Sequence, residues 1–114
     1  LDLCRSMGGN CEVFIPEGFP FLKNDMKLSE YIKRLAIELF GDEQVVDVPM
    51  RMGAEDFAHF SHQKPSFLWR LGTGNSSKGL THGLHTSRFD IDESSMRNGF
   101  SLMAYLVLSG SNIN

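Results

Sequence analysis

The sequence predicts an α/β domain, and three features support this prediction. Short segments in which apolar and polar residues alternate are followed by longer segments in which apolar residues recur every three or four positions. A chain of 114 residues has room for one modest hydrophobic core but not for two. Its composition, 41% hydrophobic and 22% charged, is ordinary for a soluble globular protein. We therefore expect strands packed under two amphipathic helices.

The first twenty residues predict a helix end, a strand and a break. Residues 1–7 are short and apolar-rich, and Gly8-Gly9-Asn10 supplies residues that stop a helix. Residues 11–15 alternate in character, as in a strand with one buried face. Pro16 and Pro20 then bias the residues before them toward extended conformations, which makes this stretch the only plausible domain boundary.

A helix is expected over residues 28–40. Asn24 or Asp25 can cap its start, and Gly41 stops it. The solvent face carries Glu30, Lys33, Arg34 and Glu38, and the buried stripe carries Leu28, Tyr31, Ile32, Leu35, Ala36 and Leu39.

Two further strands and a closing helix complete the prediction. Residues 45–48 form a short β-branched run, and residues 67–71 alternate after Pro65. The helix over residues 94–108 is capped by Asp92, and Ile91 and Met96 stand at the spacing of a hydrophobic staple. Its expected buried stripe consists of Met96, Gly99, Phe100, Met103, Leu106 and Val107.

Charge and cysteine content exclude several classes of protein. A formal net charge of −3 without a basic run argues against nucleic acid and acidic membrane surfaces as partners. No apolar run approaches the roughly 20 residues of a membrane helix. Cys4 and Cys11 do not make a disulfide framework, so we expect reduced thiols and a cytoplasmic location.

Two motifs suggest chemistry. His85 stands in a short loop followed by Phe89, two aspartates and Glu93, and a histidine so placed can offer a neutral imidazole nitrogen to a metal. About thirty residues upstream lies Met52-Gly53-Ala54-Glu55-Asp56-Phe57. By contrast, the glycines of Leu71-Gly72-Thr73-Gly74-Asn75 lack the spacing of a nucleotide-binding loop.

The order of these motifs resembles the amidohydrolase branch of the M20 metallopeptidase family, which includes hippurate hydrolases and N-acyl-amino-acid amidohydrolases. That branch carries a Gly-Ser/Ala-Glu-Asp-Phe turn, a strand ending in Leu-Gly-x-Gly, and then Leu-His-x-x-x-Phe-Asp-x-Asp-Glu before a helix. Here these are Gly53 to Phe57, Leu71 to Gly74, and Leu84 to Glu93, and Gly18 to Asp25 resembles the family's linker. The resemblance covers nearly the whole chain.

The resemblance implies an architecture. Residues 1–22 would be the last helix end and strand of a ferredoxin-like lid domain, through which the full-length protein would form a homodimer. Residues 23–114 would be the C-terminal part of a zinc-peptidase-like, three-layer αβα catalytic domain. The family's His-x-Asp, Cys-Gly-His-Asp-x-His and Glu-Glu motifs are absent from these residues, so we interpret the chain as the C-terminal piece of a longer enzyme.

The resemblance also implies site roles. His85 would be a metal ligand in a complete enzyme that binds two divalent ions, zinc or manganese, while none of the catalytic residues proper lies in this chain. The Gly53-Ala54-Glu55 turn would lie beside the active site and hold a substrate carboxylate. The competing interpretation is that Glu55 and Asp56 only satisfy the N–H groups and dipole of the helix they open. His59, His62 and His82 are expected to have no metal role.

The function implied is hydrolysis of the amide bond of N-acylated amino acids or small peptides by the parent protein, with this chain inactive alone. Two alternatives remain open. One is a non-catalytic α/β module for binding or assembly, and the other is a parent enzyme that is a dipeptidase or aminoacylase of the same family.

Overall fold

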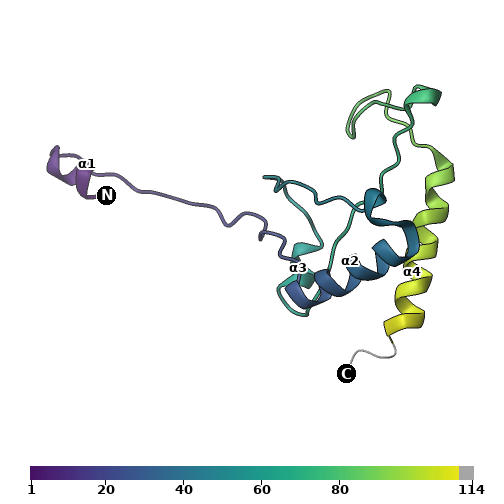
Figure 1. Ribbon diagram of the computed structural model, residues 1–114. Helices are drawn as coiled ribbons and strands as arrows, with labels where there is room; N and C mark the ends of the chain where they lie inside the picture. The colour runs from purple at the N-terminus through teal and green to yellow at the C-terminus, as the bar shows by residue number, and fades with distance from the viewer. Residues whose placement is uncertain (111–114) are drawn as a thin grey trace.

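The computed structural model describes residues 1–110 and shows two long helices that pack on each other, with a long arm at the N-terminus (Figure 1). The arm makes the molecule elongated, with extents of 65 × 44 × 20 Å. The elements in chain order are α1 (Asp2–Ser6), α2 (Met26–Phe40), η1 (Asp42–Gln44), α3 (Ala58–Ser61), η2 (Ser76–Lys78), η3 (Glu93–Ser95) and α4 (Met96–Gly110).

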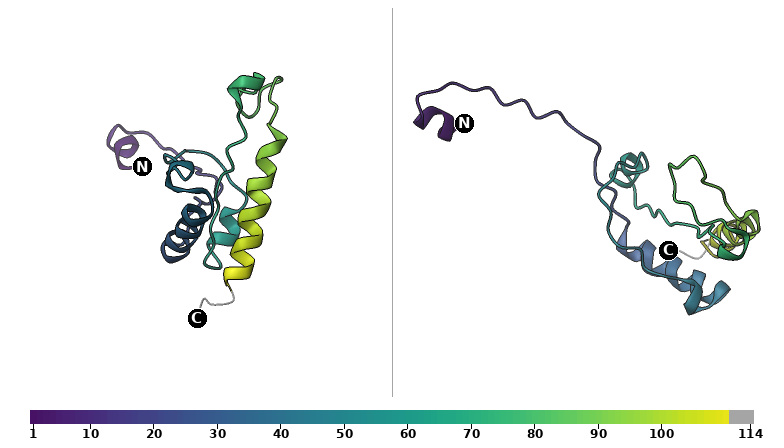
Figure 2. Two further views of the ribbon diagram at one scale, coloured as in Figure 1. Left: turned by 45° about the vertical axis from the view of Figure 1, so that its right-hand side comes forward. Right: turned by 90° about the horizontal axis from the view of Figure 1, so that it is seen from above.

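The N-terminal arm consists of α1 and an extended stretch that leads to the body. The predicted helix end is confirmed as α1, which a left-handed Gly8 with φ of 78° follows. Residues 8–18 are exposed to solvent, and the right-hand view of Figure 2 shows the arm projecting from the body. The Cys4 and Cys11 thiols are free, and the hydrogen bond between them raises the pKa of Cys11.

Helix α2 follows the sequence prediction closely. The Asp25 carboxylate accepts a hydrogen bond from the Leu28 N–H at 2.9 Å, and Gly41, with φ of 87°, ends the helix. The residues expected in solvent are exposed. Ile32, Leu35 and Ala36 are buried as predicted, whereas Leu39 at the end of the stripe remains 39% exposed.

Helix α4 is confirmed, but its predicted buried stripe is wrong. Asp92 caps η3 by accepting from the Ser94 N–H, and α4 continues directly from η3. Leu102 is the residue that is buried, at 3% exposure. Four members of the predicted stripe are instead exposed: Met96, Phe100, Met103 and Val107. Periodicity identifies an apolar helix, but this helix is apolar on more than one side, so the packing partner decided which side is covered.

Gly99 explains the side of α4 that is covered. A Cβ at this position would lie 3.2 Å from Leu71 Cδ2 and 3.9 Å from the Trp69 ring. The helix therefore approaches the 69–71 segment closely where it has no side chain, and one turn later Leu102 enters the core.

The predicted strands at 11–15, 45–48 and 67–71 do not form. Within residues 1–110 the only β-pairing is an isolated antiparallel bridge between Asn75 and Leu80. A strand requires the backbone of a neighbour, and no backbone hydrogen bond joins these three segments. Within residues 1–110 the helical layer of the predicted α/β fold is thus present and its sheet layer is not, while the three-layer arrangement and the lid domain stay predictions.

Within residues 1–110, no helix has the length and apolar character needed to cross a membrane.

The core is small, so one buried leucine should dominate it. Leu102→Ala is expected to cost about 2–5 kcal/mol in the free energy of unfolding, because it leaves a cavity between α2 and α4. The matched variant Phe100→Ala lies on the same helix with 68% exposure and should change stability by no more than ~0.5 kcal/mol. Urea unfolding followed by Trp69 fluorescence measures both, and equal losses would show that the core lies elsewhere.

Candidate functional site

His85 occupies a turn that presents its side chain to solvent. It is the one non-glycine residue with a positive φ, 63°, in the part of the chain that the structure describes. Such left-handed backbone is uncommon outside glycine, and residues that adopt it cluster at functional sites. Thr86 Oγ1 donates to the Gly83 carbonyl at 2.9 Å, and the Phe89 N–H donates to the Thr86 carbonyl at 3.1 Å. The turn is therefore closed by its own hydrogen bonds, and the imidazole is left exposed.

Asp92 anchors the loops on both sides of His85. Its Oδ1 accepts from Lys78 Nζ at 2.7 Å and from Ser94 Oγ at 2.9 Å, and its Oδ2 accepts from the Asn75 amide. Its backbone N–H donates to the Thr73 carbonyl at 2.8 Å. The side chain is buried although it is charged, which is tolerated because it is paired and hydrogen-bonded.

These contacts have an electrostatic consequence. The Lys78 ammonium, followed by Asn75 and Ser94, holds the pKa of the Asp92 carboxyl well below its usual range. The sequence predicted Asp92 only as a helix cap. Its partners Asn75 and Lys78 lie 17 and 14 positions upstream, and no local sequence pattern predicts contacts over that separation.

The neighbouring Asp90 carboxylate bonds to the backbone. Asp90 Oδ1 accepts from the Ile91 N–H at 2.8 Å, and Glu93 lies exposed in the first turn of η3. Asp92 is the residue that caps the helix start.

The Gly53-Ala54-Glu55 turn lies in an exposed loop before α3. Glu55 Oε1 accepts from the Phe57 N–H at 3.1 Å, so this carboxylate satisfies a free N–H of its own turn. The helix that follows has only four residues. No hydrogen bond or ion pair within residues 1–110 joins this turn to the His85 loop, which Figure 1 shows as a separate green excursion. A role in substrate binding stays a prediction for these residues.

His59 and His62 hold the arm to the body. His62 Nε2 lies 2.7 Å from the Phe21 carbonyl oxygen, and its ring stands edge-on to the Phe21 ring at 5.0 Å. The His59 ring has a similar edge contact with Phe19 at 6.0 Å. Sequence spacing gave no sign of this docking, since the partners are about forty residues apart.

The described residues do not by themselves fit a catalytic metal. No three of their His, Cys, Asp or Glu side chains converge on one point. Catalytic zinc sites typically use three protein ligands and one open position, so the single imidazole of His85 is too few. Any such centre would need ligands from beyond this chain, and we derive no chemical step through it.

Comparison with known proteins bears on this incomplete site. The sequence profile described as Peptidase family M20/M25/M40 matches residues 8–109. A probable hydrolase of Synechocystis is 31% identical over 105 residues, which are 91% of this chain and 27% of that protein. Thermostable carboxypeptidase 2 of Saccharolobus solfataricus is 30% identical over 97% of this chain and 28% of its own length. An IAA-amino acid hydrolase of Arabidopsis thaliana is 34% identical over 75% of this chain and 18% of its own.

The chain thus spans about a quarter of the length of the first two of these curated relatives. No solved structure gives a significant match.

The Asp92 anchor should make stability sensitive to acid. Because its folded pKa is depressed, its contribution is present above the unfolded value of about 4 and is lost as the pH falls toward the folded pKa. The wild-type chain should therefore lose more stability between pH 6 and pH 3 than Asp92→Asn does. Urea unfolding at the two pH values measures this, with Glu43→Gln as the exposed control. An equal loss in the wild type and in Asp92→Asn would contradict the anchor.

Proposed function

The chain belongs to peptidase family M20/M25/M40, and we propose that it is the C-terminal part of a metal-dependent hydrolase that cleaves the amide bond of N-acylated amino acids or small peptides. The observation that supports this most is the combination of the family match over residues 8–109 with the exposed, left-handed turn at His85. A strained turn that presents one imidazole to solvent suits a metal ligand whose partner ligands come from other segments of the protein.

The substrate class is supported by the relatives. One is called a carboxypeptidase and another an IAA-amino acid hydrolase, and both names refer to release of an amino acid. The finer assignment to hippurate hydrolases or N-acyl-amino-acid amidohydrolases rests on the motif order alone. A dipeptidase or aminoacylase parent would carry the same turn and remains the nearest alternative.

In this proposal His85 supplies one imidazole nitrogen to a centre of two divalent ions, zinc or manganese, whose mixed nitrogen and oxygen ligands suit either metal. The other ligands and the general base come from residues that this chain does not contain. The Gly53-Ala54-Glu55 turn holds the substrate carboxylate through backbone N–H groups. We also propose a cytoplasmic location and a homodimer formed through the lid.

The proposal predicts a sharp difference between two histidines of one loop. The test protein is a chimera in which this chain replaces the matching quarter of the Synechocystis hydrolase. His85→Ala should lower kcat/KM by at least ~100-fold on N-acyl amino acids and reduce the bound metal. Loss of a residue that supports a metal ligand already costs about 10- to 100-fold in activity or metal affinity, and loss of the ligand itself should cost at least as much. His82→Ala in the same loop should leave both near the level of the parent chimera. Unchanged turnover in His85→Ala at saturating metal would defeat the assignment.

The chain alone should show no turnover. Activation of water for attack on an amide needs an ion held by several fixed ligands and a nearby base. The purified chain, assayed on N-acetyl and N-benzoyl amino acids with added zinc or manganese, should not exceed its His85→Ala variant. Turnover well above that variant would show that the site is more complete than one histidine. It would also favour an autonomous enzyme over the alternative of a non-catalytic assembly module.

A further inference from the structure

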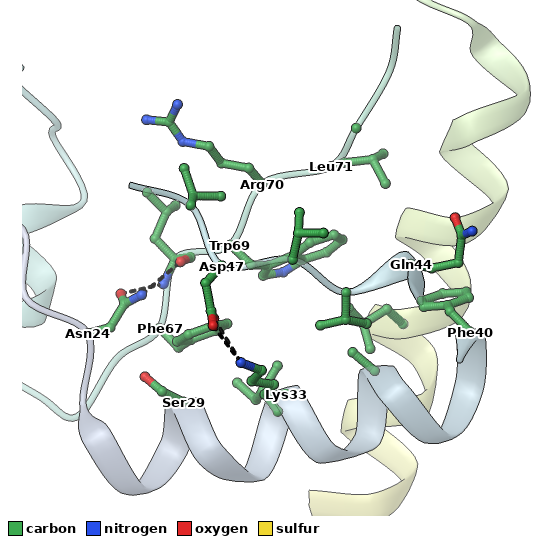
Figure 3. A pocket seen from close by; sticks show the side chains of 18 of the residues that line it. Asn24, Ser29, Lys33, Phe40, Gln44, Asp47, Phe67, Trp69, Arg70 and Leu71 are labelled. Carbon is green, nitrogen blue, oxygen red and sulfur yellow. Dashed lines mark hydrogen bonds and ion pairs between the residues drawn. The ribbon is translucent and has the colours of Figure 1, made fainter. Parts of the chain in front are cut away.

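The most reactive side chains that the proposed function leaves unused are the two thiols of the N-terminal arm, Cys4 and Cys11. They are the only cysteines of the chain, and both are free. The body offers less unused chemistry. In its hollow of about 850 Å³ beside α2 and α4, the Lys33 ammonium and the Asp47 carboxylate are already paired with each other (Figure 3).

A tight turn at the end of α1 holds the following residues against the helix. The Gly9 N–H donates to the Cys4 carbonyl at 3.0 Å, and the Gly8 N–H donates to the Arg5 carbonyl at 3.0 Å. Gly8 has a φ of 78°, a left-handed conformation that residues with a side chain rarely adopt. This pair of hydrogen bonds around a left-handed glycine is the Schellman motif of a helix end. It fixes the backbone of Gly9 next to that of Cys4.

The Cys4 sulfur lies over this turn, within reach of Cys11. A Cβ on Gly9 would lie 3.2 Å from Cys4 Sγ. Cys11 is two residues beyond Gly9, so its Cα lies within about 7.6 Å of the Gly9 Cα, because consecutive Cα atoms are about 3.8 Å apart. The two thiols are hydrogen-bonded to each other. The turn therefore brings together two sulfurs that the sequence separates by six intervening residues.

We propose that Cys4 and Cys11 are a reversible redox pair, which a small-molecule disulfide oxidises to an intramolecular disulfide that fixes the arm. A metal fits the two thiols less well. No three His, Cys, Asp or Glu side chains of residues 1–110 converge on one point, and a structural zinc site takes four protein ligands. Neither thiol belongs to the His85 turn, so a failure of the function proposed above would leave this site unaffected.

The oxidation consists of two thiol–disulfide exchange steps. Cys11 is exposed and Cys4 is half-buried, so Cys11 reacts first. Its thiolate attacks one sulfur of the small disulfide, a bond forms between these two sulfurs, the original S–S bond breaks, and one small thiolate leaves. The Cys4 thiolate then attacks the Cys11 sulfur, forms the Cys4–Cys11 bond and releases the second small thiolate. The protein loses two electrons to the small disulfide, and the two protons of the cysteines end on the two released thiols.

The disulfide decides how well α1 is ordered. The helix has five residues, and none of them is buried against the body. A helix this short has little stability of its own in water, because its first turn is costly to form. A link from Cys4 to Cys11 closes a ring around the Schellman turn and removes many of the open conformations of this stretch. The reduced arm is therefore free to fray, whereas the oxidised arm keeps α1 and its turn.

The test is a titration of the intact chain with mixtures of oxidised and reduced glutathione. Oxidation should lower the mass of the chain by two hydrogen atoms without adding glutathione, and both thiols should become unreactive toward iodoacetamide. Amide exchange at Gly8 and Gly9, the donors of the turn, should slow at least about tenfold, because the ring restricts opening of the turn. Amides of α2 should exchange at an unchanged rate.

Four variants make the test specific. Cys4→Ser and Cys11→Ser each leave one thiol, which should retain a bound glutathione instead of forming a ring. Gly8→Val puts a β-branched side chain at the left-handed position, so the equilibrium constant for disulfide formation should fall at least about fivefold. Gly18→Val is the matched control and should behave as the wild type, because Gly18 has no positive φ and a Cβ there meets open space.

Three outcomes would overturn the proposal. The first is a wild-type chain that ends as a mixed disulfide with glutathione, as the two serine variants do. The second is an unchanged equilibrium constant in Gly8→Val, which would show that the turn does not bring the thiols together. The third is a disulfide between two copies of the chain, which a gel run without reductant would reveal as a dimer.

Discussion

The packing of α2 against α4 forms most of the small core on which the body of this structure depends. Leu102 of α4 and Ile32, Leu35 and Ala36 of α2 are four of the five buried apolar residues in the described range, and the Tyr105 hydroxyl adds a 2.9 Å hydrogen bond to Glu38. The fifth, Ala58, lies in α3. A core this small can order the segments that touch it, such as residues 69–71, but it leaves distant segments such as residues 11–15 in solvent.

The loops of the candidate site depend on this helix pair through a second set of polar contacts. Asp92 at the start of the η3–α4 unit ties the 73–80 loop to the helix, and the His85 turn lies between these two fixed points. The His85 backbone is strained, and strain of this kind persists only where the surroundings determine the conformation. Asp92 is buried and paired and holds this part of the chain in place, whereas the His85 imidazole is exposed to solvent.

Backbone hydrogen bonding is the constraint that the described residues do not satisfy. Extended segments 45–48 and 67–71 have the composition of strands, yet each lacks a neighbouring strand. A sheet and the metal centre of the proposed function have one requirement in common, because each needs groups from several separate segments. The chain spans about a quarter of the length of its relatives, and His85 is one ligand only in the function proposed above.

The sequence alone determined the features that depend on near neighbours in the chain. These are the limits of α2 with its Asp25 cap and Gly41 stop, the start of α4 at Asp92, and the motif order that identifies the family. Only the tertiary structure decided which side of α4 is buried, that Asn24 binds Leu68, that Asp92 binds Lys78, and that His62 holds Phe21. Capping and periodicity act within one or two helical turns, so a sequence displays them. Burial and long-range hydrogen bonds depend on what else lies nearby in space, and for the strands that neighbour is not among the described residues.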